Sequence, residues 1–223
     1  MGRTFGRSPV ASRHLASPAI AVFQPLHRLG GDGDVVAVEA LMRPHNATII
    51  AADPLLTARV LRCALPLAQH VGSIFVNMEV AHLDDVALLA AIESAATSCA
   101  ADITVEITER GALPTPAQLG TLRDCGVKVA CDDVRLRNVA AAIELAPDVI
   151  KLEMPSMAWR PDHFATAVGQ CVEANVQVVV EGIERRSQAA RAAACGANLG
   201  QGFRWSRPLS LPAITDYLTA GVR

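Results

Sequence analysis

The stretch Val127-Lys-Val-Ala-Cys-Asp-Asp-Val-Arg-Leu-Arg137 decides the fold. Its first part, Val127 to Cys131, has the β-branched and small apolar residues that suit a strand covered on both faces. Two adjacent carboxylates, Asp132 and Asp133, follow directly. Neighbouring carboxylates repel each other unless a cation or a functional site compensates for their charge. The stretch therefore predicts a buried strand whose carboxyl end belongs to a site.

Other short apolar runs in the chain also close with polar or charged residues. Such runs end at Glu39, at Asn77, at Glu106 with Glu109 three residues later, at Lys151 and Glu153, and at Glu181 with Glu184 after it. A site built from the carboxyl ends of successive strands is typical of an α/β barrel.

The order of the predicted elements supports this fold class. Residues 20–29 and 35–43 predict two strands joined by the turn Gly30-Gly-Asp-Gly33, which indicates an antiparallel hairpin. No helix follows these glycines, and this favours the hairpin over a phosphate-binding loop. From residue 53 onwards, helices alternate with strands, as expected for parallel β-α units. We expect helices at 53–70, 83–98, 115–125, 137–145, 161–174, 186–195 and 211–220, and strands at 73–78, 102–107, 127–131, 148–153, 176–181 and 199–203.

The composition fits one domain with a large aliphatic core. The 223 residues suit one barrel-sized domain, which we place at residues 20–223. Residues 1–19 are basic and rich in Gly, Ser and Pro, so they predict a flexible tail or linker. Hydrophobic residues make up 51% of the chain, but aromatic residues only 4%. The mean hydropathy of +0.30 agrees with a core of Ala, Val, Leu and Ile.

Charge and cysteine usage exclude several classes of function. The net charge of −2, with no long basic run, argues against binding to a DNA or RNA duplex. The six cysteines form no C-x-x-C pair, so we expect buried free thiols rather than a zinc site. No apolar run has the length of a membrane span, and the first residues lack a hydrophobic signal core. A cytoplasmic location is therefore expected.

In a barrel, the polar residues at the strand ends would meet at one mouth. They are Glu39, Asn77, Glu106, Asp132, Asp133 and Glu181. These hard oxygen donors suit Mg²⁺ or Mn²⁺, and so many acids need more than one cation. Two ions roughly 3.5–4 Å apart can hold the attacking and the leaving oxygen of a phosphodiester.

Four further residues complete this hypothetical site. Lys151 lies on a neighbouring strand, and among bound cations its pKa would fall, which suits a proton acceptor or a water-orienting group. Arg43 could clamp a phosphate. Gln24 and Gln201 could offer amides to a nucleobase or a phosphate.

Taken singly, each of these residues has a plainer explanation. A strand-end acid is more often a helix N-cap or a surface ion-pair partner than a ligand. Lys151 alone could neutralise Glu153 or Glu181, and Arg43 alone could be an ordinary surface arginine. The repetition of the pattern on successive strands is what favours a common site.

Eight short motifs in order resemble the EAL-domain family. They span about residues 20–218: Phe23-Gln-Pro, Val38-Glu-Ala-Leu-Met-Arg43, Val76-Asn77, Val105-Glu-Ile-Thr-Glu109, Asp132-Asp133, Ile150-Lys151, Val180-Glu-Gly-Ile-Glu184 and Gln201-Gly-Phe203 with Arg207-Pro208. The resemblance implies a modified (β/α)8 barrel of the TIM type with an antiparallel first strand. It also implies hydrolysis of cyclic di-GMP to linear pGpG with Mg²⁺ or Mn²⁺.

The same resemblance implies a role for each residue of the site. Glu39, Asn77, Glu106, Asp132, Asp133 and Glu181 would bind two metal ions, and Glu39 would thereby serve catalysis. Lys151 would act on the attacking water, and Glu109 would steady the loop after the strand 127–131. Gln24, Leu41, Arg43, Glu184 and Gln201 would contact the substrate.

The chain departs from the family pattern in two places. The family usually continues its Asp-Asp pair with Phe-Gly-Thr-Gly-Tyr-Ser-Ser, a loop that helps to organise the metals and a dimer contact. Here the loop is Val134-Arg-Leu-Arg-Asn-Val-Ala140, without a glycine to adopt φ > 0 readily. In addition, only 38 positions (77 − 39) separate Glu39 from Asn77. Active members carry a longer insert there, with an aromatic residue where Pro44 follows Arg43.

Three functions remain open at this point. The complete ligand set favours a cyclic di-GMP phosphodiesterase, including one with slow turnover. The altered loop and the shortened segment favour a non-catalytic module that binds the nucleotide or a protein partner. A barrel enzyme that abstracts a proton with Lys151 fits the acids but gives Arg43 and the glutamines no role. A homodimer is compatible with the resemblance.

Overall fold

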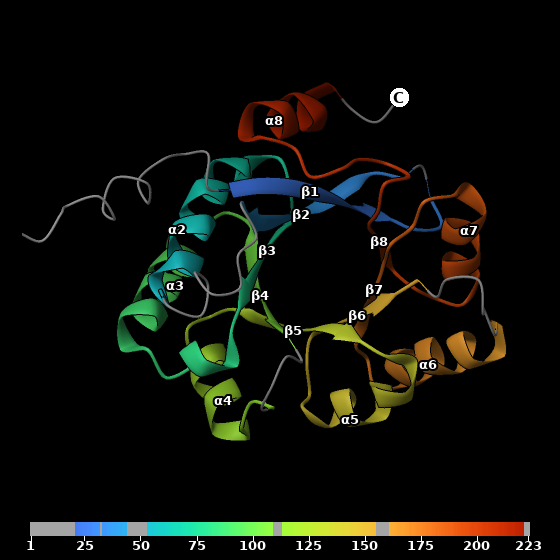
Figure 1. Ribbon diagram of the computed structural model, residues 1–223, viewed down its shortest axis with the longest axis horizontal. Helices are drawn as coiled ribbons and strands as arrows, with labels where there is room; N and C mark the ends of the chain where they lie inside the picture. Colours follow the sequence, from blue (N-terminus) through green and yellow to red (C-terminus); the bar gives the residue numbers. More distant parts are fainter. Residues whose placement is uncertain (1–20, 32, 44–52, 109–112, 155–160, 221–223) are drawn as a thin grey trace, which may run out of the picture.

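The computed structural model describes the chain except residues 1–20, 32, 44–52, 109–112, 155–160 and 221–223. The predicted tail and Glu109 lie outside the described residues. Eight strands form a closed barrel in sequence order (Figure 1), which confirms the predicted fold class. The first strand, β1 (Ala21–Arg28), is antiparallel to β2 (Val35–Met42) and to β8 (Leu199–Gly200).

The remaining strand pairs are parallel, as the alternation of strands and helices predicts. The strands between β2 and β8 are β3 (Ser73–Met78), β4 (Asp102–Thr108), β5 (Lys128–Val134), β6 (Val149–Glu153) and β7 (Gln177–Glu181). Because parallel strands share one direction, their carboxyl ends lie at the same rim of the barrel.

Helices cover the outside of the barrel, and their ends follow local sequence signals. Thr115 caps one helix with a capping box, and Asp85 caps another through the N–H of Leu88. Pro66 lies where an α-helix gives way to a 3₁₀ turn, as its missing N–H predicts. The α-helices are α2 (Leu55–Ala64), α3 (Val86–Ser98), α4 (Pro116–Asp124), α5 (Val139–Glu144), α6 (Pro161–Glu173), α7 (Arg186–Ala194) and α8 (Leu211–Ala220), and the 3₁₀ turns are η3 (Leu65–Gln69), η4 (Val80–His82) and η5 (Leu136–Asn138).

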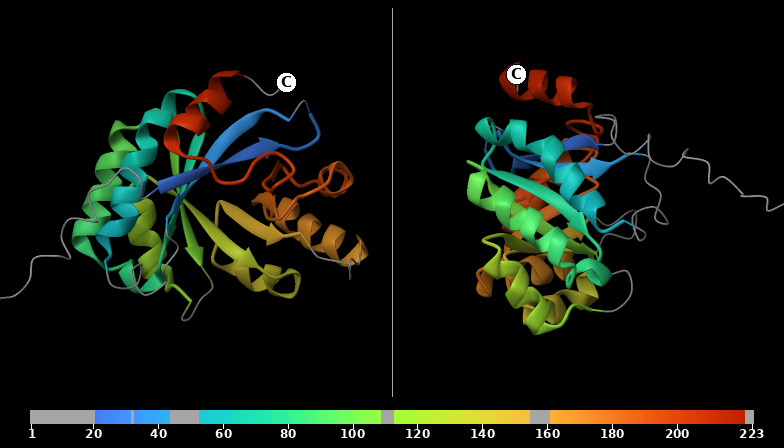
Figure 2. Two further views of the ribbon diagram at one scale, coloured as in Figure 1. Left: turned by 45° about the horizontal axis from the view of Figure 1, so that its top comes forward. Right: turned by 90° about the vertical axis from the view of Figure 1, so that its left-hand side faces the viewer.

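The hairpin of β1 and β2 has no helix between its strands, and α8 lies over it instead (Figures 1 and 2). The partly buried Tyr217 of α8 hydrogen-bonds to His27 of β1, so the end of the chain closes this side of the barrel. Among the helices that the structure describes, none has the length and apolar character needed to cross a bilayer.

Two strands end three residues away from the expected position, while the others agree within one residue at each end. β5 continues through Asp132 and Asp133 to Val134, whereas β8 ends at Gly200 instead of residue 203. The chain turns after Gly200 because Gly202 adopts a φ of +152° and accepts hydrogen bonds from the N–H groups of Trp205 and Ser206.

Alternation along the strands divides the interior into two layers. Strand side chains alternate between the inner and the outer face. The lower interior is an apolar cluster of Leu26, Ala37, Phe75, Ala130, Val149, Val179 and Leu199. Two residues further along the corresponding strands come Glu39, Asn77, Asp132, Lys151 and Glu181. The polar layer therefore rests on a packed hydrophobic floor.

Replacement of Phe75 by alanine is expected to remove the largest side chain of this floor. Phe75 is 1% exposed, so Phe75→Ala should lower the free energy of unfolding by about 3–5 kcal/mol. Urea denaturation followed by circular dichroism measures this change. Val172→Ala, on the exposed side of α6, is the control and should stay within about 0.5 kcal/mol of the parent. An equally small effect of Phe75→Ala would contradict the packed interior.

Candidate functional site

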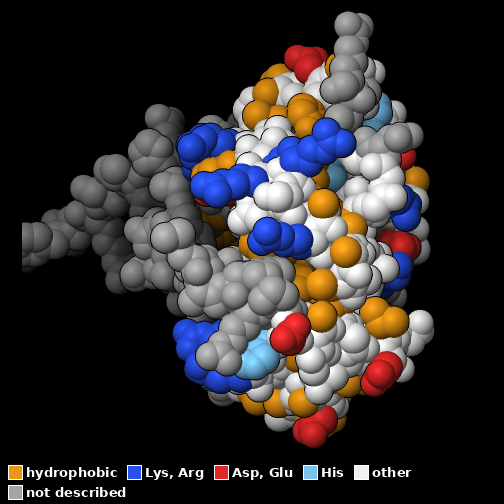
Figure 3. All heavy atoms as spheres, turned by 90° about the vertical axis from the view of Figure 1, so that its right-hand side faces the viewer, with side chains coloured by type: hydrophobic (Ala, Val, Ile, Leu, Met, Phe, Trp, Pro, Cys, Tyr) orange, Lys and Arg blue, Asp and Glu red, His pale blue; other side chains and the backbone are white. Residues whose placement is uncertain are grey.

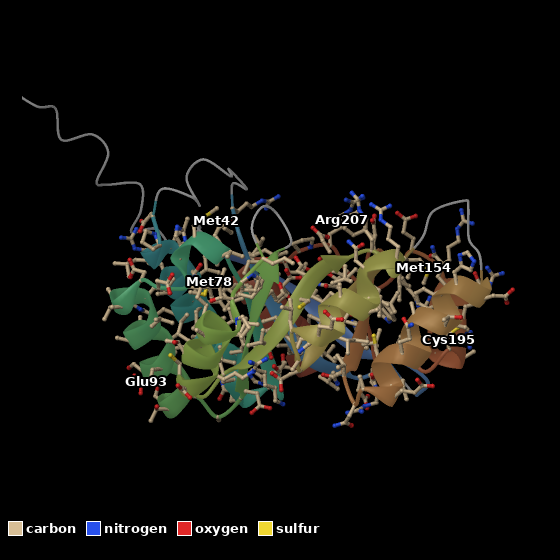
Figure 4. All side chains as sticks on the ribbon, turned by 90° about the horizontal axis from the view of Figure 1, so that it is seen from below. Met42, Met78, Glu93, Met154, Cys195 and Arg207 are labelled. Carbon is tan, nitrogen blue, oxygen red and sulfur yellow. The ribbon has the colours of Figure 1, made fainter. Side chains whose placement is uncertain are left out.

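The carboxyl ends of the strands form one rim of the barrel. Figure 4 shows Met42, at the end of β2, and Arg207, in the loop after β8, near one edge of the molecule. Met154, directly after β6, lies on the same side, and Glu93 of α3 lies near the opposite edge. The polar interior layer opens at this rim.

Lys151 on β6 lies at the centre of the polar layer. Its side chain is 1% exposed, and its Nζ lies 2.7 Å from Glu106 Oε1, 3.0 Å from Asp132 Oδ1, 3.0 Å from Glu181 Oε1 and 3.5 Å from Glu39 Oε2. One ammonium group thus contacts carboxylates from four other strands. Ionisation of all four would leave three negative charges uncompensated within this group.

Glu39 is held in place by two amides. The Nδ2 of Asn77 donates to Glu39 Oε1 over 3.0 Å, and the Nε2 of Gln201 donates to Glu39 Oε2 over 2.8 Å. The backbone carbonyl of Asn77 in turn accepts a hydrogen bond from the buried Thr57 of α2. These contacts hold the Glu39 carboxylate towards Lys151.

A β-bulge brings both residues of the Asp132-Asp133 pair to the site. Consecutive residues of a regular strand point to opposite faces, so only one of the pair would face inwards. Against β6, however, Cys131 pairs with Ile150 and Val134 pairs with Leu152, which inserts one extra residue into β5. Asp133 takes a φ of +54°, which Asp tolerates better than most residues. Ligand atoms of Asp132, Asp133 and Glu181 consequently lie within 4.8 Å of one another.

Crowding of the carboxylates shifts their protonation equilibria. Burial and then the charge of Glu39 raise the pKa of Glu106 well above its usual value, despite the attraction of Lys151. Burial also raises the pKa of Asp132, and it raises that of Glu181 to about 7. Glu39 differs, because Lys151 and its hydrogen bonds outweigh burial and lower its pKa.

The pKa of Lys151 is governed by the same carboxylates. Burial by itself would lower the pKa of the amine, but attraction to Glu106, Glu39, Glu181 and Asp132 raises it well above the usual value. The fall in the pKa of Lys151 that the sequence predicts requires neighbouring cations. With only carboxylates around the amine, its pKa shifts in the opposite direction. Lys151 is therefore a full cation in this arrangement.

The residues of this layer suit divalent cations. Glu106 Oε2 is buried and has no hydrogen-bond partner among the described residues, so one of its acceptor oxygens is left unsatisfied. All the side chains other than Lys151 offer hard oxygen donors. Burial first, and neighbouring carboxylates second, raise the pKa values of Glu106, Asp132 and Glu181. Cations of the Mg²⁺ class would supply both the missing ligand and the missing charge.

A pocket of about 170 Å³ adjoins this layer between the loops after β7 and β8. Three predicted substrate contacts line it, namely Gln24, Glu184 and Gln201. Gln24 also donates from Nε2 to the carbonyl of Ser206. Phe203 forms a further wall, and the predicted site residues did not include it. The sequence signal that could have identified Phe203 as a site residue is its position directly after Gln201 and Gly202.

Other predicted residues lie at the rim, outside the buried layer. Leu41 is a partly buried residue of β2, and Arg43 follows that strand with an exposed side chain. On the face that α6 and α7 cover, Lys and Arg side chains gather towards one edge (Figure 3). The loops after β7 and β8 contribute exposed arginines to the rim, namely Arg185, Arg186, Arg204 and Arg207. These charges favour the approach of an anionic ligand.

A family model described as the EAL domain matches residues 16–208 of the chain. No curated protein matches this chain. Solved structures are similar over nearly the whole chain. The EAL domain of Mycobacterium smegmatis DcpA is 20% identical with a TM-score of 0.74, and the match covers 92% of this chain and 99% of that one.

Two further structures have the same fold. The EAL domain protein of Listeria monocytogenes EGD-e is 19% identical with a TM-score of 0.72, covering 90% of this chain and 92% of that one. The Bacillus subtilis YkuI protein, solved with its substrate cyclic di-GMP and calcium, is 19% identical with a TM-score of 0.69. That match covers 90% of this chain and 58% of YkuI.

The raised pKa of Glu181 predicts a pH-dependent stability in the absence of divalent cations. Between its usual pKa of 4.5 and about 7, folded Glu181 keeps a proton that the unfolded chain has released. The stability from this group is thus present at low pH and is lost as the pH rises through about 7. In EDTA, the free energy of unfolding should fall from pH 5 to pH 8, with a contribution from Glu181 on the order of 1–3 kcal/mol.

Glu181→Gln isolates this contribution, because the variant cannot release a proton at this position. Urea denaturation in EDTA at both pH values should give a smaller fall for Glu181→Gln than for the parent. An identical fall in both proteins would show that Glu181 does not titrate in this way.

Proposed function

The chain belongs to the EAL domain family, and on this basis we propose that it binds cyclic di-GMP with divalent cations and hydrolyses it to linear pGpG. One observation carries the proposal. Four carboxylates from different strands lie within 3.5 Å of the buried Lys151. This arrangement suits a site that binds divalent cations next to one lysine. The structure of YkuI with cyclic di-GMP and calcium supports the choice of ligand.

In this proposal, six side chains bind two Mg²⁺ or Mn²⁺ ions: Glu39, Asn77, Glu106, Asp132, Asp133 and Glu181. Bound cations would lower the pKa of water and polarise the phosphodiester. Lys151 donates hydrogen bonds that orient the attacking water, and its charge offsets the carboxylates around it. The water oxygen bonds to phosphorus and releases one proton to solvent, the bond from phosphorus to the 3′ oxygen breaks, and that oxygen takes up one proton from solvent. The product is linear pGpG.

The rim residues bind the rest of the nucleotide. Arg43 clamps a phosphate, Leu41 provides an apolar contact, and Gln24, Gln201 and Glu184 contact the substrate. The role proposed for Glu109, to steady the loop after β5, concerns a residue outside the described part of the chain. The arginines after β7 and β8 attract the doubly anionic ligand over a longer range.

A second function is a nucleotide receptor without turnover. The segment after the Asp132-Asp133 pair favours it, because Val134 to Ala140 lacks glycine and forms the end of β5, the η5 turn and the start of α5. Such a protein would keep metal-dependent binding of cyclic di-GMP but would act through a protein partner or a homodimer.

Incubation of the protein with cyclic di-GMP and excess Mn²⁺ or Mg²⁺ tests the hydrolase. We expect pGpG to appear by chromatography with the parent but not with Glu39→Ala, which lacks a ligand. Lys151→Met should lower the rate by roughly 100- to 10,000-fold because it removes the group that acts on water. Lys128→Met is the matched control, since the exposed Lys128 pairs with Asp102 at the start of the barrel strands, and it should retain the parental rate.

The two functions give different results in this assay. Absence of pGpG from the parent over hours, at high protein concentration, would contradict hydrolysis. Metal-dependent binding of cyclic di-GMP, measured by calorimetry in the same protein, would then favour the receptor.

A further inference from the structure

One buried hydroxyl joins the helix α2 to the polar layer of the barrel. Thr57, near the start of α2, is 7% exposed, and its Oγ1 donates a hydrogen bond to the backbone carbonyl of Asn77 over 2.9 Å. Asn77 lies near the end of β3 and is one of the proposed cation ligands. Thr57 belongs to none of the motifs that resemble the family. Its contact therefore connects the site to a residue that the motifs did not identify.

The helix itself gives no reason for a threonine at this position. Threonine is a poorer helix former than alanine or leucine, and a hydroxyl buried without a partner costs free energy. A helical threonine often returns its hydroxyl to a carbonyl one turn back, as Thr215 of α8 does with Leu211. Thr57 bonds to a neighbouring strand instead. The other buried residues of α2 are apolar, namely Leu56, Ala58, Val60, Leu61 and Ala64.

The hydrogen bond from Thr57 meets β3 where its pairing with β2 has ended. The last pair between these two strands is Ala40 with Val76, so Asn77 lies one residue beyond it. On the other side, β4 still pairs with β3 through Glu106 and Asn77. Thr57 thus ties the backbone of Asn77 to α2 at a point where β2 no longer holds it.

The start of α2 is a firm support for this contact. The carboxylate of Asp53 accepts a hydrogen bond from the N–H of Leu55 over 3.1 Å and forms an ion pair of 2.9 Å with Arg59. Because both charged side chains are partly exposed, the ion pair by itself adds little to stability. Together with the burial of Leu56, however, these contacts set the place from which Thr57 reaches the strand.

The position of Asn77 matters because its side chain has two tasks. Its Nδ2 donates to Glu39 Oε1 over 3.0 Å, and only its amide oxygen can bind a cation. A shift at the end of β3 would move this oxygen and would also disturb the hydrogen bond that orients Glu39. Cations of the Mg²⁺ class tolerate little departure from their preferred geometry. Groups that orient metal ligands from behind are accordingly important for metal affinity.

We infer that Thr57 is a positioning residue of the cation site, which acts by holding the backbone of Asn77 and, through its side chain, the carboxylate of Glu39. The inference rests on the proposed function and extends its site from the barrel strands to the helix α2. Thr57 itself contacts neither cation nor substrate. Loss of its hydroxyl should therefore weaken the binding of divalent cations although every ligand is still present.

Binding of Mn²⁺, measured by electron paramagnetic resonance of the free ion, tests this role without requiring turnover. Thr57→Val keeps the shape of the side chain but removes the hydroxyl, and it should weaken Mn²⁺ binding by about 10- to 100-fold. Thr57→Ser restores a hydroxyl and should bind Mn²⁺ nearly as tightly as the parent. Thr57→Ala also lacks the hydroxyl and provides the same comparison if Thr57→Val does not fold.

Thr215→Val is the matched control, because the hydroxyl of Thr215 bonds within its own helix, and it should bind Mn²⁺ as the parent does. Thermal denaturation in EDTA separates loss of the site from loss of folding. Unchanged Mn²⁺ affinity in a folded variant without the hydroxyl, or an equal loss in Thr57→Ser, would overturn the role of Thr57 while the proposed function stands. Absence of Mn²⁺ binding by the parent would overturn the cation site and the role of Thr57 with it. Mn²⁺ binding by the parent without formation of pGpG would contradict hydrolysis alone.

Discussion

The rest of the site depends on one buried cation among buried acids. Lys151 contacts Glu39, Glu106, Asp132 and Glu181, and the side chains of Lys151 and Glu106 are almost fully buried. Burial of charges is costly unless they are paired, and one amine cannot pair four carboxylates. The layer therefore holds an excess of negative charge that a protein built only for stability would avoid. This excess is what makes the layer suitable for divalent cations.

The barrel supplies the rigidity that this arrangement needs. An apolar floor that includes Phe75 and Val149 supports the polar layer from below, and amides of Asn77 and Gln201 hold Glu39 from the side. Like charges stay close only where the surrounding structure prevents their separation. Here each of the four carboxylates around Lys151 is carried by a different strand of a closed sheet, which fixes the backbone positions of these residues relative to one another.

The loops beside the acidic layer contribute positive charge through some residues and a pocket through others. Arginines after β7 and β8 give the rim a positive character around a negative centre. Between the same loops, Phe203 and Glu184 line a pocket that also includes Glu181 and Gln201 from the edge of the acidic layer. The positive charge of the rim and the lining of the pocket thus come largely from separate residues, even though both lie within one rim.

The sequence by itself determined the barrel, the order of its elements and the residues at the strand ends, because alternation and turn chemistry are local. It did not reveal the bulge that turns Asp133 towards Glu181, since the register of β5 against β6 depends on strands that pair across the sheet. The direction of the Lys151 pKa shift and the pocket at Phe203 were also decided only by tertiary structure. Both depend on distances between residues far apart in the chain, which no local pattern encodes.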